Sequence, residues 1–72
     1  MNLELTRHAR NRMRHARLNE SDVEAMVASP DSSVVDARGR TVARKRIHGA
    51  TFRVVYVMED ERLVIITVFE EL

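Results

Sequence analysis

The spacing of apolar residues predicts two helices in the N-terminal part of the chain. A helix over residues 7–17 would bring four apolar side chains onto one narrow stripe: Leu5, Ala9, Met13 and Ala16. Thr6 can cap this helix, because its hydroxyl can accept a hydrogen bond from a free amide of the first turn. Asn19 is expected to cap a second helix, with Asp22 in the capping-box position. This helix should end just before Pro30, because the residue preceding a proline avoids the helical conformation.

After the proline, the pattern changes to that of β-strands. Apolar and β-branched residues gather in four segments separated by turns: residues 33–37, 41–47, 51–58 and 63–69. In the second segment, Arg44 and Arg46 would point to one face, while Ala43, Lys45 and Ile47 would point to the other. The last two segments are apolar on both faces, so their strands should be central in the sheet or covered on both sides. The order of elements predicts an α+β domain with two N-terminal helices packed on a four-stranded antiparallel sheet.

The length of the chain limits it to one small domain over residues 1–72. A chain of 72 residues and 8.3 kDa should be only marginally stable, because it buries only about 60% of its unfolded surface. It has no cysteine, which excludes disulfides and thiolate metal sites. The longest apolar run is too short to span a bilayer, and the N-terminus lacks the features of a signal peptide. We therefore expect a cytoplasmic protein with no membrane partner.

Charge is distributed unevenly, although the net charge is only +1. Residues 1–18 hold five arginines and one acid, and residues 37–53 hold six bases and no acid. Residues 19–36 hold five acids and no base, and residues 54–72 hold five acids and one arginine. Eleven of the 12 cations are arginines, which suit bidentate binding of phosphate or carboxylate. The two basic segments could together form a phosphate-binding surface, or they could pair with the acidic segments inside the fold.

Three segments resemble a family of small bacterial domains. Residues 6–13 resemble its opening motif T-x-H-A-x-x-R-M, residues 18–24 resemble G-I-S/T-x-x-D-V-E, and residues 63–70 resemble a last strand V-I-T-V-Y. Two departures are Phe69, where the family often has tyrosine, and Arg17, where it usually has glycine. That family is grouped with the RelE/ParE-like toxins. The resemblance implies two helices on a curved antiparallel sheet, with a basic cleft that holds RNA in the RNA-cleaving members, which use no metal.

RNA cleavage without a metal needs a base for the 2′-hydroxyl, a cation beside the phosphorane and an acid for the 5′-oxygen. Histidine can serve as base or acid near neutral pH, and arginine can bind two phosphate oxygens. The candidate catalytic residues are therefore His8 as acid or base, Arg12 and Arg46 as phosphate ligands, and Tyr56 to orient a hydroxyl or a base. The candidate RNA-binding residues are Arg7, Arg10, Arg14, Arg44 and Lys45. His15 and His48 are further proton carriers.

Each candidate also has a purely structural explanation. His8 could cap its helix or pack beside Leu5, and Tyr56 could belong to the core with its hydroxyl at the rim. Arg12 could hold Glu70 or Glu71 and tie the first helix to the last strand. A metal site on the first helix is not expected, because its two histidines are poorly spaced for a divalent ion. No glycine-rich loop is present, so no nucleotide cofactor is expected.

Two functional hypotheses follow from the sequence. The first is a RelE-like toxin-type domain that binds RNA, free or on the ribosome, in an arginine-lined cleft, and that could cleave it as a metal-independent endoribonuclease. The second is a non-enzymatic interaction domain that binds an acidic protein partner of the antitoxin type or forms a homodimer. The second hypothesis is favoured by strands that are too apolar for so small a monomer to cover.

Overall fold

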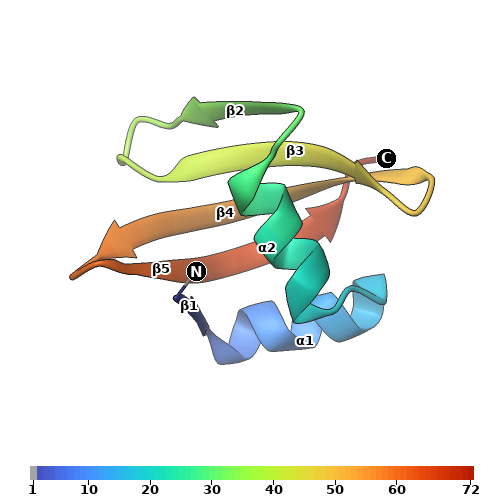
Figure 1. The fold of residues 1–72 in the computed structure, drawn as a ribbon, viewed down its shortest axis with the longest axis horizontal. Helices are drawn as coiled ribbons and strands as arrows, with labels where there is room; N and C mark the ends of the chain where they lie inside the picture. Colours follow the sequence, from blue (N-terminus) through green and yellow to red (C-terminus); the bar gives the residue numbers. More distant parts are fainter. Residues whose placement is uncertain (1) are drawn as a thin grey trace.

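The computed structural model describes residues 2–72, which form two helices and one five-stranded sheet (Figure 1). The helices are α1 (Arg7–Ala16) and α2 (Glu20–Ala28). The strands are β1 (Leu3–Leu5), β2 (Ser32–Val35), β3 (Thr41–Ile47), β4 (Ala50–Glu59) and β5 (Arg62–Glu70). Their order across the sheet is β1-β5-β4-β3-β2, so the two apolar strands β4 and β5 lie in its interior.

The predicted four-stranded antiparallel sheet is wrong, although the fold is α+β as expected. The additional strand β1 pairs in parallel with β5, with Leu3 beside Leu63 and Leu5 beside Ile65, which makes the sheet mixed. A three-residue strand is too short to show a periodicity of its own. In addition, Leu5 also fits the apolar stripe of the following helix. Only the position of β5 in the folded chain supplies the backbone groups with which this segment pairs.

The junction between β1 and α1 is fixed by Thr6. Its hydroxyl accepts a hydrogen bond from the amide of Ala9 (3.0 Å), which caps α1 as predicted. The same hydroxyl lies 3.1 Å from the carbonyl oxygen of Ile65 and 3.2 Å from that of Ile66, to which it can donate. The cap therefore also anchors the start of α1 to β5, so the helix runs alongside that strand (Figure 1).

Both helices end near the predicted positions. Arg17 ends α1 in the left-handed conformation (φ 59°), and its backbone amide donates to the carbonyl of Arg14 (3.1 Å). Asn19 and Asp22 form a complete capping box at the start of α2, because each side chain accepts a hydrogen bond from the other's backbone amide (2.8 and 3.0 Å). These local signals fix the boundaries of the helices before any tertiary contact is considered.

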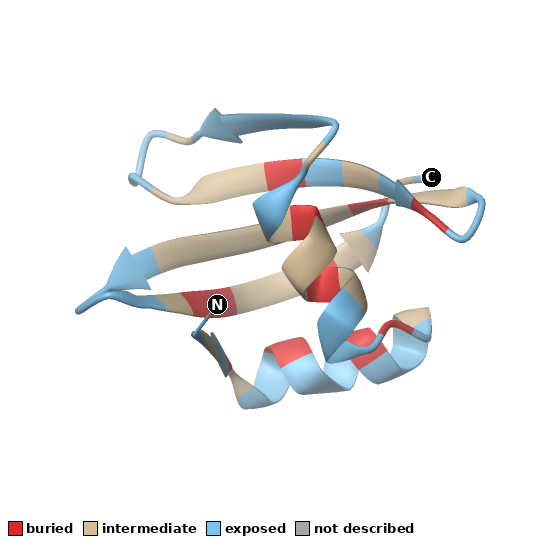
Figure 2. Ribbon diagram, viewed as in Figure 1, coloured by how far each residue is buried: buried red, intermediate tan, exposed pale blue. Residues whose placement is uncertain are grey.

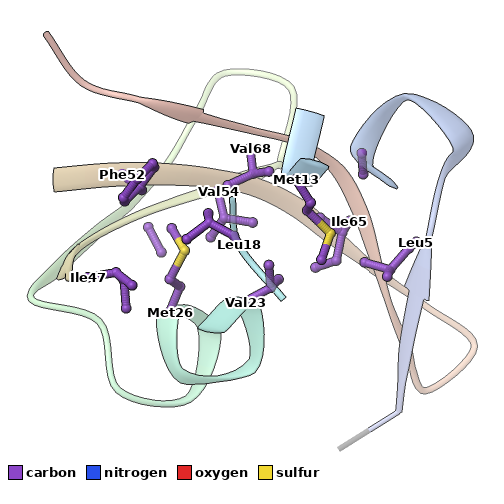
Figure 3. Packing of buried hydrophobic residues seen from close by; sticks show 12 residues of the cluster. Leu5, Met13, Leu18, Val23, Met26, Ile47, Phe52, Val54, Ile65 and Val68 are labelled. Atoms are coloured by element: carbon purple, nitrogen blue, oxygen red, sulfur yellow. The ribbon is translucent and has the colours of Figure 1, made fainter. Parts of the chain in front are cut away.

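The hydrophobic core lies between the two helices and one face of the sheet (Figure 3). Its buried members are Leu5, Ala9, Met13, Leu18, Val23, Met26, Ala43, Ile47, Phe52, Val54, Ile65 and Val68. Met26 is the largest side chain that is completely buried. Burial of an aliphatic side chain of this size contributes about 1.5–3 kcal/mol. The core therefore positions α1 beside β1 and β5, and α2 over β3 and β4.

The strand β3 alternates as predicted. Ala43 and Ile47 are buried against the helices, whereas Arg44 and Arg46 are exposed on the opposite face of the sheet. At the sheet edge, all four residues of β2 are exposed (Figure 2). Within residues 2–72, neither helix is long and apolar enough to cross a membrane.

Candidate functional site

The exposed surface of α1 is rich in arginine. The helix and the residue that follows it carry five exposed arginines: Arg7, Arg10, Arg12, Arg14 and Arg17. Within residues 2–72, none of them lies within 4.0 Å of a carboxylate oxygen. Among these described residues, the single side-chain hydrogen bond that the five arginines make joins Arg14 to Asn11, at 3.4 Å. We call this group of five residues the α1 arginine surface. It covers two flanks of the helix: Arg10 and Arg14 lie toward the start of α2, and Arg12 lies toward the end of β5.

This surface carries an electrostatic cost that the fold leaves uncompensated. Arg7 and Arg10 are three positions apart and Arg10 and Arg14 are four apart, and like charges at these spacings each destabilise a helix by about 0.2–0.5 kcal/mol. The first turn of α1 contains no acidic residue, so Arg7 also faces the positive end of the helix dipole. The helix persists because Thr6 caps it and because Ala9 and Met13 are buried. Positive charge is thus concentrated where a bound polyanion would relieve the repulsion.

Beside the arginine surface, α1 meets the outer edge of β5. The Nε2 atom of His8 lies 3.0 Å from the hydroxyl oxygen of Thr67, within hydrogen-bonding distance. The cap of the helix is Thr6, so His8 is not needed for that role. One turn and two turns further along, Arg12 and His15 line a pocket of about 130 Å³. His8, Arg12 and His15 therefore all lie along the junction between α1 and β5.

The pocket at this junction combines three kinds of chemistry. Arg12 and His15 share it with Glu70 at the end of β5, and Ala16, Val68 and Phe69 complete its lining. An arginine, a histidine and a carboxylate supply a cation and two groups that can carry a proton. At about 130 Å³ the pocket is smaller than the roughly 300–1,000 Å³ typical of small-molecule sites. A ligand larger than this would therefore extend beyond the pocket.

The sequence suggests Glu70 only as one of two carboxylates with which Arg12 could form an ion pair. Within residues 2–72 no ion pair joins Arg12 to Glu70, and Glu71 is bound by other arginines. Glu70 and Arg12 are far apart in the sequence, so no spacing rule connects them. Only the packing of α1 against β5 brings Arg12 and Glu70 to one pocket.

The second basic segment is partly neutralised inside the fold. Arg44 donates to both carboxylate oxygens of Glu71 (2.7 and 2.9 Å), and Arg53 donates to one of them (3.0 Å). The hydrogen bonds from Arg44 and then from Arg53 lower the pKa of Glu71 to about 2. Arg53 was not among the predicted site residues. It stands directly opposite Arg44 in the β3–β4 pairing, a position that becomes apparent only from the strand register.

Two further basic candidates connect the sheet to α2. The ammonium group of Lys45 donates to the carbonyl oxygen of Ser29 (2.7 Å), at the end of α2. His48, at the tip of the β3–β4 hairpin, places its Nε2 atom 3.4 Å from Asp22. Both side chains thus have partners within the fold, which differs from the situation of the α1 arginines.

The four candidate catalytic residues lie in three separate places. His8 and Arg12 share the junction between α1 and β5, whereas Tyr56 on β4 is half-buried against the core. The side chain of Arg46 is exposed near the end of β3, and its backbone amide donates to Asp31 (2.9 Å). In the sheet, β4 lies between β3 and β5, the strand against which α1 packs. Within residues 2–72, no hydrogen bond or ion pair connects Tyr56 or the Arg46 side chain with His8 or Arg12.

The geometry defines a small α+β domain that exposes an arginine-rich helix beside a polar pocket at the sheet edge. The chain belongs to the family described as domain of unknown function DUF4258, which it matches over residues 5–70. Comparison with curated proteins and with solved structures gave no significant match. Within residues 2–72, no three His, Cys, Asp or Glu side chains are grouped so that they could hold a metal ion.

Proposed function

We propose that this chain is a RelE-like toxin-type domain that binds RNA through the α1 arginine surface. The observation that supports this proposal is that all five arginines lack a carboxylate partner among residues 2–72, while Arg44 and Arg53 have one. Phosphate contacts from unpaired arginines supply most of the affinity of sequence-independent nucleic-acid binding. The resemblance of residues 6–13 to the RelE/ParE-related motif points to the same helix.

The pocket beside this surface is the place at which RNA would be cleaved. Arg12 would bind the scissile phosphate and stabilise the charge of the phosphorane. A base takes the proton of the 2′-hydroxyl, the 2′-oxygen attacks phosphorus, and an acid protonates the departing 5′-oxygen, which leaves a 2′,3′-cyclic phosphate. His8 would be one of these two proton carriers, and His15 or Glu70 would be the other. The proposal omits Arg46 and Tyr56 from this site, because they lie elsewhere on the sheet.

Binding is tested with a fluorescent single-stranded RNA at 50 mM salt. The variant Arg10→Ala/Arg14→Ala removes two cations from the α1 arginine surface. The control Arg38→Ala/Arg62→Ala removes two cations elsewhere: Arg38 in the turn before β3, and Arg62, which is paired with Glu4 (2.6 Å), at the start of β5. We expect the first variant to bind more weakly and to lower the slope of log K against log salt by about 1.4, that is, 0.7 for each lost contact. An equal effect of both variants would show that only the overall charge matters.

Cleavage is tested separately, with EDTA present and with circular dichroism to confirm folding. We expect His8→Ala and Arg12→Ala to abolish cleavage, and Glu70→Gln to reduce it. The variant Arg46→Ala should cleave as the wild type does, because Arg46 lies on β3, on the face of the sheet opposite the helices. If the wild type does not cleave RNA, or if the first two substitutions leave cleavage unchanged, the catalytic part of the proposal fails and the binding part stands on its own test.

The second candidate function is a non-enzymatic interaction domain, which is supported by the exposed edge strand β2. Val34 and Val35 are 65% and 69% exposed, and no strand pairs with the outer side of β2 among residues 2–72. A free strand edge of this kind can pair with an extended segment of another chain. Such a segment could come from an acidic partner of the antitoxin type or from a second copy. Light scattering at micromolar concentration tests the homodimer, and a monomer would count against self-association.

A further inference from the structure

On the face of the sheet opposite the core, two arginines converge on one carboxylate. Arg44 on β3 and Arg53 on β4 are cross-strand neighbours, so their like charges are held close together. A directly opposed pair of like charges destabilises an antiparallel sheet. Glu71 compensates for this, because it receives three hydrogen bonds from the two guanidinium groups, at 2.7, 2.9 and 3.0 Å. The pair of arginines thus forms a binding site for an oxyanion that the protein fills with its own side chain.

The carboxylate of Glu71 is held in a way that allows an external anion to replace it. Glu71 follows the last residue of β5, and its backbone amide makes one hydrogen bond, to the carbonyl of Thr51 (2.8 Å). The side chains of Arg44, Arg53 and Glu71 are 44%, 40% and 29% exposed, so water and solutes reach all three. Ion pairs with this degree of exposure contribute little net stability, because solvent screens them. An external anion therefore faces a weak internal competitor.

The surroundings of the two arginines offer room for a ligand. A pocket of about 210 Å³ adjoins them, lined by Ser32, Ser33, Val34, Val42, Arg44 and Arg53. The serine residues add hydroxyl groups that can donate to an oxyanion. Arg46 lies on the same face of β3, two residues beyond Arg44, and is exposed. The region thus stays positively charged even while Glu71 occupies it.

We propose that Arg44 and Arg53 form a binding site for a phosphate group, and that Glu71 is its exchangeable internal ligand. Two guanidinium groups bound to one carboxylate leave one positive charge uncompensated. A phosphate monoester, with a charge of about −1.5 to −2 near neutral pH, matches two arginines more closely than a carboxylate does. It also offers three oxygens to the N–H donors that now converge on Glu71. This site is separate from the α1 arginine surface and does not depend on RNA binding there.

Inorganic phosphate is the first probe, titrated into the full chain and followed by thermal shift and by calorimetry. We expect Glu71→Ala to bind phosphate more tightly than the wild type, by up to about fivefold, because a weak competing carboxylate is gone. The control is Glu59→Ala, which removes an exposed acid at the end of β4 that, within residues 2–72, pairs with neither arginine. It should bind phosphate as the wild type does. The double variant Arg44→Ala/Glu71→Ala should lose the gain.

The outcomes separate the proposal from its alternatives. Equal phosphate binding by Glu71→Ala and the wild type, or a gain that persists without Arg44, would overturn it. If Glu71→Ala lowers the melting temperature because the arginines repel each other, Glu71→Gln provides a milder neutral variant for the same titration. Loss of RNA binding at α1 would leave these results unaffected, so failure of the RNA proposal and failure of this one are distinguishable.

The source of the phosphate is resolved with two further probes, a nucleoside monophosphate and a short RNA with or without a 5′-phosphate. A preference for the 5′-phosphorylated RNA that disappears in Arg44→Ala/Glu71→Ala identifies the end of an RNA as the ligand. Binding of the mononucleotide, with no preference between the two RNAs, identifies a small phosphate compound. Failure of all phosphate probes to bind Glu71→Ala more tightly than Glu59→Ala contradicts the proposal.

Discussion

Replacement of Arg7 by glutamate should make the protein more stable and, at the same time, a weaker RNA binder. Arg7 is the first residue of α1, is exposed, and has no carboxylate partner among residues 2–72. If its role were structural, the substitution would weaken the fold. If it serves to bind a polyanion at the expense of stability, the two properties should change in opposite directions.

The size of the stability gain can be worked from the position of the residue. A charge in the first turn interacts with the helix dipole by about 0.3–1 kcal/mol, unfavourably for arginine and favourably for glutamate. The spacing of three residues between Arg7 and Arg10 turns a repulsion of about 0.2–0.5 kcal/mol into an attraction of similar size. The lower ends of these ranges together give about 1 kcal/mol. For a domain of 60–100 residues this corresponds to a rise in melting temperature of about 4–8 °C.

The effect on RNA follows from the loss of one phosphate contact. The slope of log K against log salt should fall by about 0.7, and binding at 50 mM salt should weaken, because an anion now faces the polyanion. Thermal unfolding by circular dichroism measures the first property, and fluorescence anisotropy between 50 and 200 mM salt measures the second. Arg38→Glu is the matched control, because Arg38 is an exposed turn residue and the change in net charge is the same.

Two results would refute this reasoning. A fall in melting temperature for Arg7→Glu would show that the arginine supports the helix, so that its exposure carries no functional meaning. Equal losses of RNA affinity in Arg7→Glu and Arg38→Glu would show that RNA responds to net charge alone. In that second case the α1 arginine surface would not be the binding site.

The remaining predictions concern the cap of α1, the hydrophobic core and the titration of Glu71. Thr6→Val should cost about 1–2 kcal/mol in urea unfolding, and Thr6→Ser should restore most of it, because the hydroxyl caps α1 and contacts β5. Met26→Ala should cost about 2–5 kcal/mol by cavity formation, visible as partial unfolding at 25 °C. Because the arginines lower the pKa of Glu71 from 4.5 to about 2, its stabilisation is complete above pH 4.5 and is lost as pH falls through about 2. Acid unfolding of Glu71→Gln should lack that contribution, and an unchanged acid transition would contradict the assignment.

Local patterns in the sequence were sufficient to locate most elements. The capping side chains of Thr6 and Asn19 were identified correctly, because capping involves neighbours three residues away. The strand over residues 41–47 was predicted with its observed bounds. The predicted turn between residues 41–47 and 51–58 is a hairpin at His48-Gly49, with φ angles of 51° and 85° that suit a tight turn. These features depend on interactions within one turn or one strand pair.

The candidate site was predicted less completely. His8, Arg12 and His15 are spaced at i, i+4 and i+7 in the sequence, which places them on one side of the first helix. The structure places that side along β5. The sequence did not indicate that Glu70 joins Arg12 and His15 in a pocket. The predicted single cleft required Arg46 and Tyr56 to meet His8, and the strand order places them elsewhere.

By itself, the sequence determined the helices, their caps, the four longer strands and the face of β3 that carries arginine, because each follows from the spacing of nearby residues. The tertiary structure decided the parallel strand β1, since three residues pair only when β5 lies beside them. It also decided which arginines are free. Glu71 reaches Arg44 across 27 residues and Arg53 across 18. Contacts between residues so far apart in the sequence depend on strand order and register, which no local pattern specifies.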